Sequence, residues 1–132
     1  MYKKFNPITG KCGEIVEEIM QSPEVLPLND TTRFKIRLCA EEAIENIISY
    51  AYGHNDGFIE VNSCISDDNF VLSLKDGGMP FNPLGRKDPD INKPLEEREV
   101  GGLGIFICKR MMDDVRYTYK DGCNILTMSI RN

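Results

Sequence analysis

The stretch Asn29–Tyr52, NDTTRFKIRLCAEEAIENIISYAY, decides the fold because it carries the clearest helical pattern in the chain. Asn29 or Asp30 is suited to cap its start, and a Gly-rich segment beginning at Gly53 breaks the pattern. At about 100° per residue one arc of the helix is apolar. We expect that arc to face a sheet, and it holds Ile36, Ala40, Ala43, Ile44, Ile47, Ile48 and Ala51.

Shorter patterned segments flank this helix on both sides. A first helix is predicted near 11–20, and strands at 58–65 and 70–76 form a hairpin around Asp67-Asp68-Asn69. Alternation gives each strand an apolar face, made of Ile59, Val61 and Ile65 in one and Phe70, Leu72 and Leu74, continued by Asp76, in the other. A third helix at 105–112 and strands at 115–120 and 124–131, joined by Asp121-Gly122, complete the order.

This order predicts one domain, 1–132, of the α+β class, with helices on one face of a mixed, mostly antiparallel sheet. The 132 residues are 41% hydrophobic and 28% charged, which is typical of a single globular domain. The net charge of −5 argues against direct binding of nucleic acid. We expect no membrane span and no signal peptide, a cytoplasmic location, and five reduced, mostly buried cysteines.

Residues 77–100 contain four prolines, three glycines before Gly101 and many charges, so a continuous helix or central strand is excluded there. A loop of this length inside a compact domain is usually functional or disordered. We interpret it as a lid over a ligand, although the prolines are also consistent with a stiffened linker.

Glu42 and Asn46 lie one helical turn apart, roughly opposite the apolar arc. The simpler interpretation is a solvated helix face. The alternative is a functional pair, in which Asn46 supplies one oxygen to Mg²⁺ and Glu42 acts as a general base, because Mg²⁺ completes its coordination with water and phosphate oxygens.

Asp76 and the segment Gly101–Gly104 also have two interpretations each. Asp76 is in phase with buried residues, so it either caps amides of the following loop or accepts a hydrogen bond from adenine, with Gly78 permitting close approach of the base. The glycine-rich turn precedes a helix whose amides suit phosphate, although tight helix–sheet packing is the simpler explanation of these glycines.

Three segments in this order resemble the N, G1 and G2 boxes of the GHKL (histidine kinase-like) ATPase superfamily. Within it the chain is most similar to anti-sigma factor serine kinases of the RsbW type. The resemblance covers about residues 30–132 and rests on Ala40-Glu41-Glu42-Ala43-Ile44-Glu45-Asn46, Asp76-Gly77-Gly78-Met79-Pro80-Phe81-Asn82-Pro83 and Gly101-Gly102-Leu103-Gly104-Ile105-Phe106-Ile107.

The resemblance implies a Bergerat-type fold that binds ATP and Mg²⁺ beneath the lid. It implies Glu42 as the catalytic base, Asn46 as the metal ligand, and a nucleotide-binding set of Asn46, Asp76, Gly78, Pro80, Gly102, Leu103 and Gly104. The implied activity is phosphorylation of a serine in an anti-sigma factor antagonist of the STAS class. A sigma factor and a second copy of the chain are possible further partners, and the first strand is expected within Tyr2–Phe5.

Three other functions share parts of this pattern. One is a nucleotide-gated binding module with little or no phosphotransfer. Another is the catalytic domain of a sensor histidine kinase, but the single histidine, His54, lies in a predicted turn, and we expect no phospho-accepting helical hairpin before the domain. A gyrase-, chaperone- or mismatch-repair-type ATPase needs additional domains that 132 residues do not contain.

Overall fold

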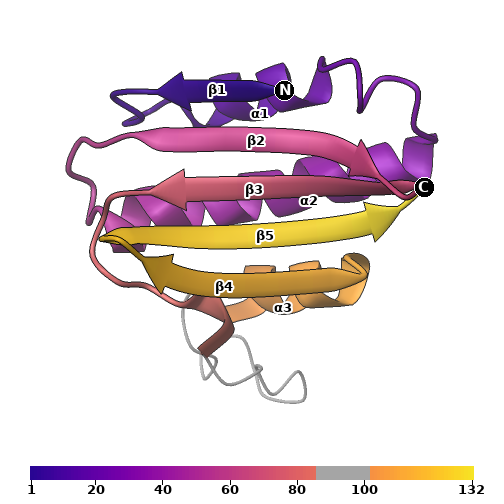
Figure 1. The fold of residues 1–132 in the computed structure, drawn as a ribbon. Helices are drawn as coiled ribbons and strands as arrows, with labels where there is room; N and C mark the ends of the chain where they lie inside the picture. Colours follow the sequence, from indigo (N-terminus) through magenta and orange to yellow (C-terminus); the bar gives the residue numbers. More distant parts are fainter. Residues whose placement is uncertain (86–101) are drawn as a thin grey trace.

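The computed structural model describes residues 1–85 and 102–132. For residues 102 and 103 it describes the backbone only. Its strands form one sheet in the order β1-β2-β3-β5-β4, and every neighbouring pair is antiparallel. They are β1 (Tyr2–Phe5), β2 (Ile59–Ser66), β3 (Asn69–Asp76), β4 (Asp114–Lys120) and β5 (Cys123–Arg131). Helices α1 (Cys12–Met20), α2 (Asp30–Asn46) and α3 (Gly102–Met111) cover one face (Figure 1). The predicted α+β class is confirmed.

The core lies between the helix layer and the inner face of the sheet. Phe70, Leu72 and Leu74 are buried as the alternation predicts, and the apolar arc of α2 packs against them. Ile59, Val61 and Ile65 lie on one face of β2, as predicted, because their partners on β3 are Asp76, Leu74 and Phe70. Ile65 is nevertheless 47% exposed, because the end of β2 lies beside the loop between α1 and α2 and Ile65 borders an open groove there with Pro23 and Leu28.

Helix α2 begins at a side-chain N-cap and is followed directly by a π-helical turn. Asn29 Oδ1 accepts a hydrogen bond from the Thr32 N–H at 2.8 Å, which selects Asn29 as the cap. After α2 the chain continues as a π-helical turn, η1 (Ile47–Ala51). The carbonyl of Ala51 accepts from the Met79 N–H at 2.9 Å. The end of this helix is therefore attached to the segment that follows β3.

Helix α3 begins earlier than the sequence suggested. Gly102 and Gly104 lie inside its first turn rather than in a turn before it, whereas Gly101 lies outside the described residues. The buried side chains of Ile105 and Cys108 hold α3 against α2. Packing of this kind outweighs the modest helix propensity of glycine.

Of the predicted lid, residues 77–85 are described and include a short 3₁₀ helix, η2 (Pro83–Gly85), while 86–100 lie outside the described residues. All five cysteines are free. The expectation of mostly buried thiols holds only for Cys39 and Cys108, because Cys64 is exposed and the other two are partly covered.

Candidate functional site

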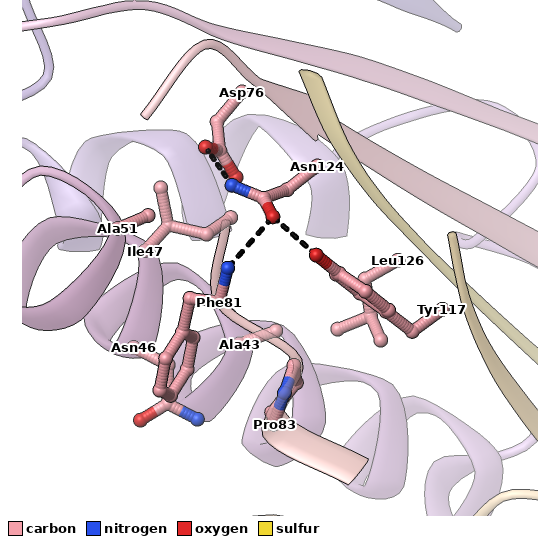
Figure 2. Close-up of a pocket in the computed structure, with 10 residues that line it drawn as sticks. All are labelled: Ala43, Asn46, Ile47, Ala51, Asp76, Phe81, Pro83, Tyr117, Asn124 and Leu126. Carbon is pink, nitrogen blue, oxygen red and sulfur yellow. Dashed lines mark hydrogen bonds between the residues drawn. The ribbon is translucent and has the colours of Figure 1, made fainter. Parts of the chain in front are cut away.

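A pocket lies at the end of the sheet where β3 stops and β5 starts (Figure 2). Asp76 and Asn124 are direct partners in the β3–β5 register, so two polar side chains meet at this point. The empty volume of the pocket, including the part that is open to solvent, is about 310 Å³. Its lining comes from α2, η1, three strands and the segment after β3, and comprises Ala43, Asn46, Ile47, Ala51, Asp76, Phe81, Pro83, Tyr117, Asn124 and Leu126.

Asp76 is the buried carboxylate of this pocket, with 1% of the residue exposed. Its Oδ1 accepts hydrogen bonds from the Gly78 N–H and from Asn124 Nδ2, both at 2.9 Å. Burial raises the pKa of Asp76 above its ordinary value, while these two donors act in the opposite direction. The first sequence interpretation, a cap for a loop amide, is therefore confirmed. Because both hydrogen bonds go to Oδ1, the second carboxylate oxygen, Oδ2, is available to a ligand.

Asn124 is a site residue that the sequence analysis missed. It is 4% exposed and binds Asp76, Met79, Phe81 and Tyr117, as described below. A signal was present, because Asn124 stands in phase with the buried Leu126, Met128 and Ile130 of β5. The same argument that singled out Asp76 on β3 would have found it.

Asn46 lines the pocket from α2 and is only 8% exposed, so it does not lie on a solvated face. Figure 2 shows its amide pointing away from Asp76, with no hydrogen bond to the other nine residues drawn. Periodicity placed this residue opposite the apolar arc. Of the two interpretations, the solvated helix face is wrong for Asn46, because α3 and the segment after β3 cover that side of α2. Binding of Mg²⁺ by Asn46 stays a prediction.

Glu42 lies one turn before Asn46 and does not line the pocket; it is half-buried beneath α3. An ideal Cβ atom at Gly104 would be 1.9 Å from Glu42 Oε2, so the missing side chain makes room for the carboxylate. Burial raises the pKa of Glu42, and the neighbouring carboxylates of Glu41 and Glu45 raise it further. The structure therefore brings Glu42 and Gly104 together across α2 and α3.

Gly78 and Pro80 belong to the segment that leaves β3. A Cβ atom at Gly78 would lie 2.5 Å from the carbonyl oxygen of Ala51, so in this structure the glycine permits close packing against η1. Pro80 is exposed and does not line the pocket. Contacts of either residue with a nucleotide stay predictions.

Phe81 packs into the pocket and limits its size. Its ring stacks on Tyr50, with ring centroids 5.0 Å apart and planes inclined by 22°. The free cavity that remains is about 20 Å³, room for about one water molecule. A cavity of this size does not hold an adenine ring, so side chains that line the pocket have to move before one can enter.

The donor set of the site suits a nucleotide better than a metal held by protein alone. Within residues 1–85 and 102–132, no group of three or more His, Cys, Asp or Glu side chains is arranged to hold a metal ion. A single amide oxygen, that of Asn46, fits Mg²⁺ when phosphate oxygens and water supply the other ligands. The buried acceptor Asp76 fits the amino group of adenine.

Comparison with known proteins places this geometry in a family. Residues 11–130 match the histidine kinase-like ATPase domain. The chain belongs to that family. The resemblance found in the three sequence boxes is thereby confirmed, and the boxes lie on α2, at the end of β3 and at the start of α3 of a histidine kinase-like ATPase domain.

Among curated proteins, relatives of this histidine kinase-like ATPase domain include serine kinases. Serine-protein kinase RsbW of Listeria monocytogenes is 31% identical over 96 residues, which are 69% of this chain and 61% of that protein. RsbW of Bacillus cereus is 32% identical over 95 residues, covering 69% and 59%. Serine/threonine-protein kinase BtrW of Bordetella bronchiseptica is 30% identical over 99 residues, covering 74% and 69%. The chain thus matches about three fifths of the length of the RsbW proteins.

Among solved structures, the histidine kinase AdeS of Acinetobacter baumannii aligns with 99% of this chain and 67% of its own, with a TM-score of 0.55 and 18% identity. At that identity the likeness shows the fold alone, and it confirms the histidine kinase-type fold that was expected. None of the helices in the described parts of the chain has the length and apolar character needed to cross a membrane.

Proposed function

We propose that this chain is a single ATP-binding domain that acts as a serine protein kinase on an anti-sigma factor antagonist of the STAS class. The observation that carries the nucleotide half of the proposal is Asp76, a buried carboxylate with one oxygen saturated by two donors inside a pocket also lined by Asn46. The curated relatives are named as serine or serine/threonine kinases, which supports the reaction class.

In this proposal each site residue has a separate task. Oδ2 of Asp76 accepts a hydrogen bond from the adenine amino group, and Gly78 and Pro80 shape the path of the chain beside the base. The first turn of α3, formed by Gly102, Leu103 and Gly104, presents helix-terminal amides to phosphate oxygens. Asn46 holds Mg²⁺, which when bound neutralises charge on the phosphates.

Glu42 is the proposed general base. It accepts the proton of the substrate serine as the serine oxygen attacks the γ-phosphorus and ADP leaves. Burial and the carboxylates of Glu41 and Glu45 raise its pKa, and a carboxylate with a raised pKa is a stronger base at neutral pH. The 77–100 segment is proposed to close over the bound nucleotide.

Transfer of labelled γ-phosphate tests this assignment. The chain is incubated with ATP, Mg²⁺ and each STAS-domain protein encoded in the same genome, and Glu42→Gln is compared with wild type. We expect Glu42→Gln to lose transfer while its dissociation constant for ATP stays within about 3-fold of wild type, since the base contributes about 10²–10⁴-fold to such steps. Glu14→Gln, at an exposed position in α1, is the matched control, because Glu14 does not perturb Glu42, and it should transfer normally. Undiminished transfer by Glu42→Gln would remove Glu42 from the mechanism.

A nucleotide-gated binding module without phosphotransfer is the second candidate, and the position of Glu42 favours it. The carboxylate is packed under Gly104 and away from the pocket lining, so a substrate hydroxyl reaches it only if α3 or the Glu42 side chain shifts. Binding of ATP and of a STAS protein or a sigma factor, without transfer to any STAS protein tested, would establish this alternative. Sedimentation of the free chain would test whether it forms a homodimer, the second-copy partner that the resemblance implies.

A further inference from the structure

Asn124 uses its whole hydrogen-bonding capacity at the bottom of the pocket. Its Nδ2 donates to Asp76 Oδ1 at 2.9 Å and to the Met79 carbonyl at 2.8 Å. Its Oδ1 accepts from the Phe81 N–H at 3.0 Å and from the Tyr117 hydroxyl at 2.5 Å. A primary amide has two donor hydrogens and two acceptor lone pairs, so no capacity is left to contact a ligand. Figure 2 shows the side chain between Asp76, Phe81 and Tyr117.

These partners fix which way the amide of Asn124 points. With the amide turned over, its oxygen would face the Asp76 carboxylate and the Met79 carbonyl, and all three are acceptors. Its NH₂ group would meanwhile face the Phe81 N–H, which is a donor. The observed orientation is the one in which every donor meets an acceptor. The backbone groups of Met79 and Phe81 thus hold a donor against Asp76.

The consequence reaches Asp76 itself. Because Oδ1 receives both Asn124 Nδ2 and the Gly78 N–H, the carboxylate is held in one orientation and its charge is stabilised against the cost of burial. Its second oxygen is then an acceptor with a fixed direction. Such an acceptor pairs with the 6-amino group of adenine and loses its partner when a purine lacks that group.

We propose that Asn124 is the positioning residue that makes this pocket selective for 6-aminopurine nucleotides, by holding Asp76 as an oriented acceptor without touching the base. The inference rests on the proposed binding of ATP at Asp76. It assigns selectivity to a residue on β5 that lies outside the three sequence boxes.

Selectivity is measured as a ratio of dissociation constants, for ATP and for purine riboside triphosphate, which carries hydrogen in place of the 6-amino group. Both are measured with Mg²⁺ by calorimetry or by displacement of a fluorescent nucleotide. We expect wild type to favour ATP by about 10- to 100-fold, the value of one hydrogen bond to a charged group. Asn124→Ala should reduce the ratio below about 3-fold, mainly by weakening ATP. Asn124→Ser, which has a shorter side chain than asparagine but keeps one hydroxyl donor, should recover part of the ratio.

A control variant separates positioning from loss of structure. Ser63→Ala removes a buried hydroxyl on β2 that is bonded to Glu24 and lies outside the pocket lining. It should leave the ratio unchanged even if the protein melts earlier.

Several results would overturn the proposal. If Asn124→Ala weakens both nucleotides in parallel and keeps the wild-type ratio, Asn124 is only a structural residue. If the alanine variant does not fold, the serine variant decides, and a folded serine variant without any selectivity contradicts a role for donation to Asp76. Absence of binding of either nucleotide by wild type would instead refute the proposed function, and this inference with it.

Discussion

Replacing Gly104 with alanine should separate the position of Glu42 from the stability of the fold. The added Cβ atom would lie 1.9 Å from Glu42 Oε2 and 2.5 Å from its Cδ. Non-bonded heavy atoms are comfortable at about 3.5 Å or more, so the carboxylate has to retreat by about 1.5 Å. It is the flexible end of a side chain, and therefore α3 can stay in place while the carboxylate moves.

The substitution should raise or preserve the stability of the fold but lower the rate of phosphate transfer. Alanine is favoured over glycine in a helix by about 0.5–1 kcal/mol, so the free energy of unfolding should be unchanged or higher by up to about 1 kcal/mol. A misplacement of about 1 Å at a reacting group costs on the order of 100-fold in rate, which is about 2.7 kcal/mol of activation free energy. We therefore expect a protein at least as stable as wild type that transfers phosphate about 100-fold more slowly.

The assay is a single-turnover transfer rate at saturating ATP, with urea unfolding measured on the same preparations. Gly13→Ala is the matched control, because Gly13 lies in α1 and a Cβ atom there meets nothing within 4 Å. It should show the stabilisation without the loss of rate. A Gly104→Ala protein that transfers at the wild-type rate would refute the reasoning, as would one whose slower rate is explained by weaker ATP binding or by unfolding.

Two further predictions concern the end of β3. Gly78→Ala should lower the free energy of unfolding by about 1–3 kcal/mol, seen as a lower Tm, because its Cβ would lie within 2.8 Å of the carbonyl oxygen, carbonyl carbon and Cβ of Ala51. Gly85→Ala should leave Tm unchanged, because a Cβ atom at that position makes only ordinary van der Waals contacts. Asp76→Asn should raise Tm at pH 7, because burial raises the pKa of the Asp76 carboxyl and its ionised form therefore opposes folding above that pKa. The gain in Tm should shrink as the pH falls toward about 4, where the carboxyl becomes protonated in the unfolded chain as well. An equal gain at both pH values, or none, would contradict this assignment.

Much of the architecture was predictable because it follows local periodicity. The helix at 30–51, both hairpins and the burial of Phe70, Leu72 and Leu74 required only the alternation of apolar residues and the turn residues between them. Asp76 was found the same way, as a polar residue at a buried phase. The roles that the three boxes imply for individual residues, by contrast, came from resemblance and stay predictions.

The misses arise where one element is covered by another that is distant in sequence. Asn46 looked solvated because periodicity describes one helix alone, whereas α3 and the residues around Phe81 bury the opposite side of α2. Alternation gave Ile65 the same strand face as Val61, which is correct, but it does not show that the end of β2 borders an open groove. The π-helical turn at 47–51 has no signal in side-chain pattern; its last carbonyl is bound by the Met79 N–H, a contact between segments 28 residues apart.

Asp76 and Asn124 together make the strongest physical argument that this end of the sheet is a binding site. They interrupt the apolar faces of two adjacent strands at the same register position. An apolar pair at these positions would fill the core without the desolvation of a charge, and replacing buried polar groups by well-packed apolar ones is often neutral or stabilising. The chain instead keeps a carboxylate there, together with an amide whose four hydrogen bonds hold it. Buried polar residues of this kind are expected where function rather than stability selects the residue. Here the oxygen that remains available, Asp76 Oδ2, is the acceptor that a nucleotide base would need.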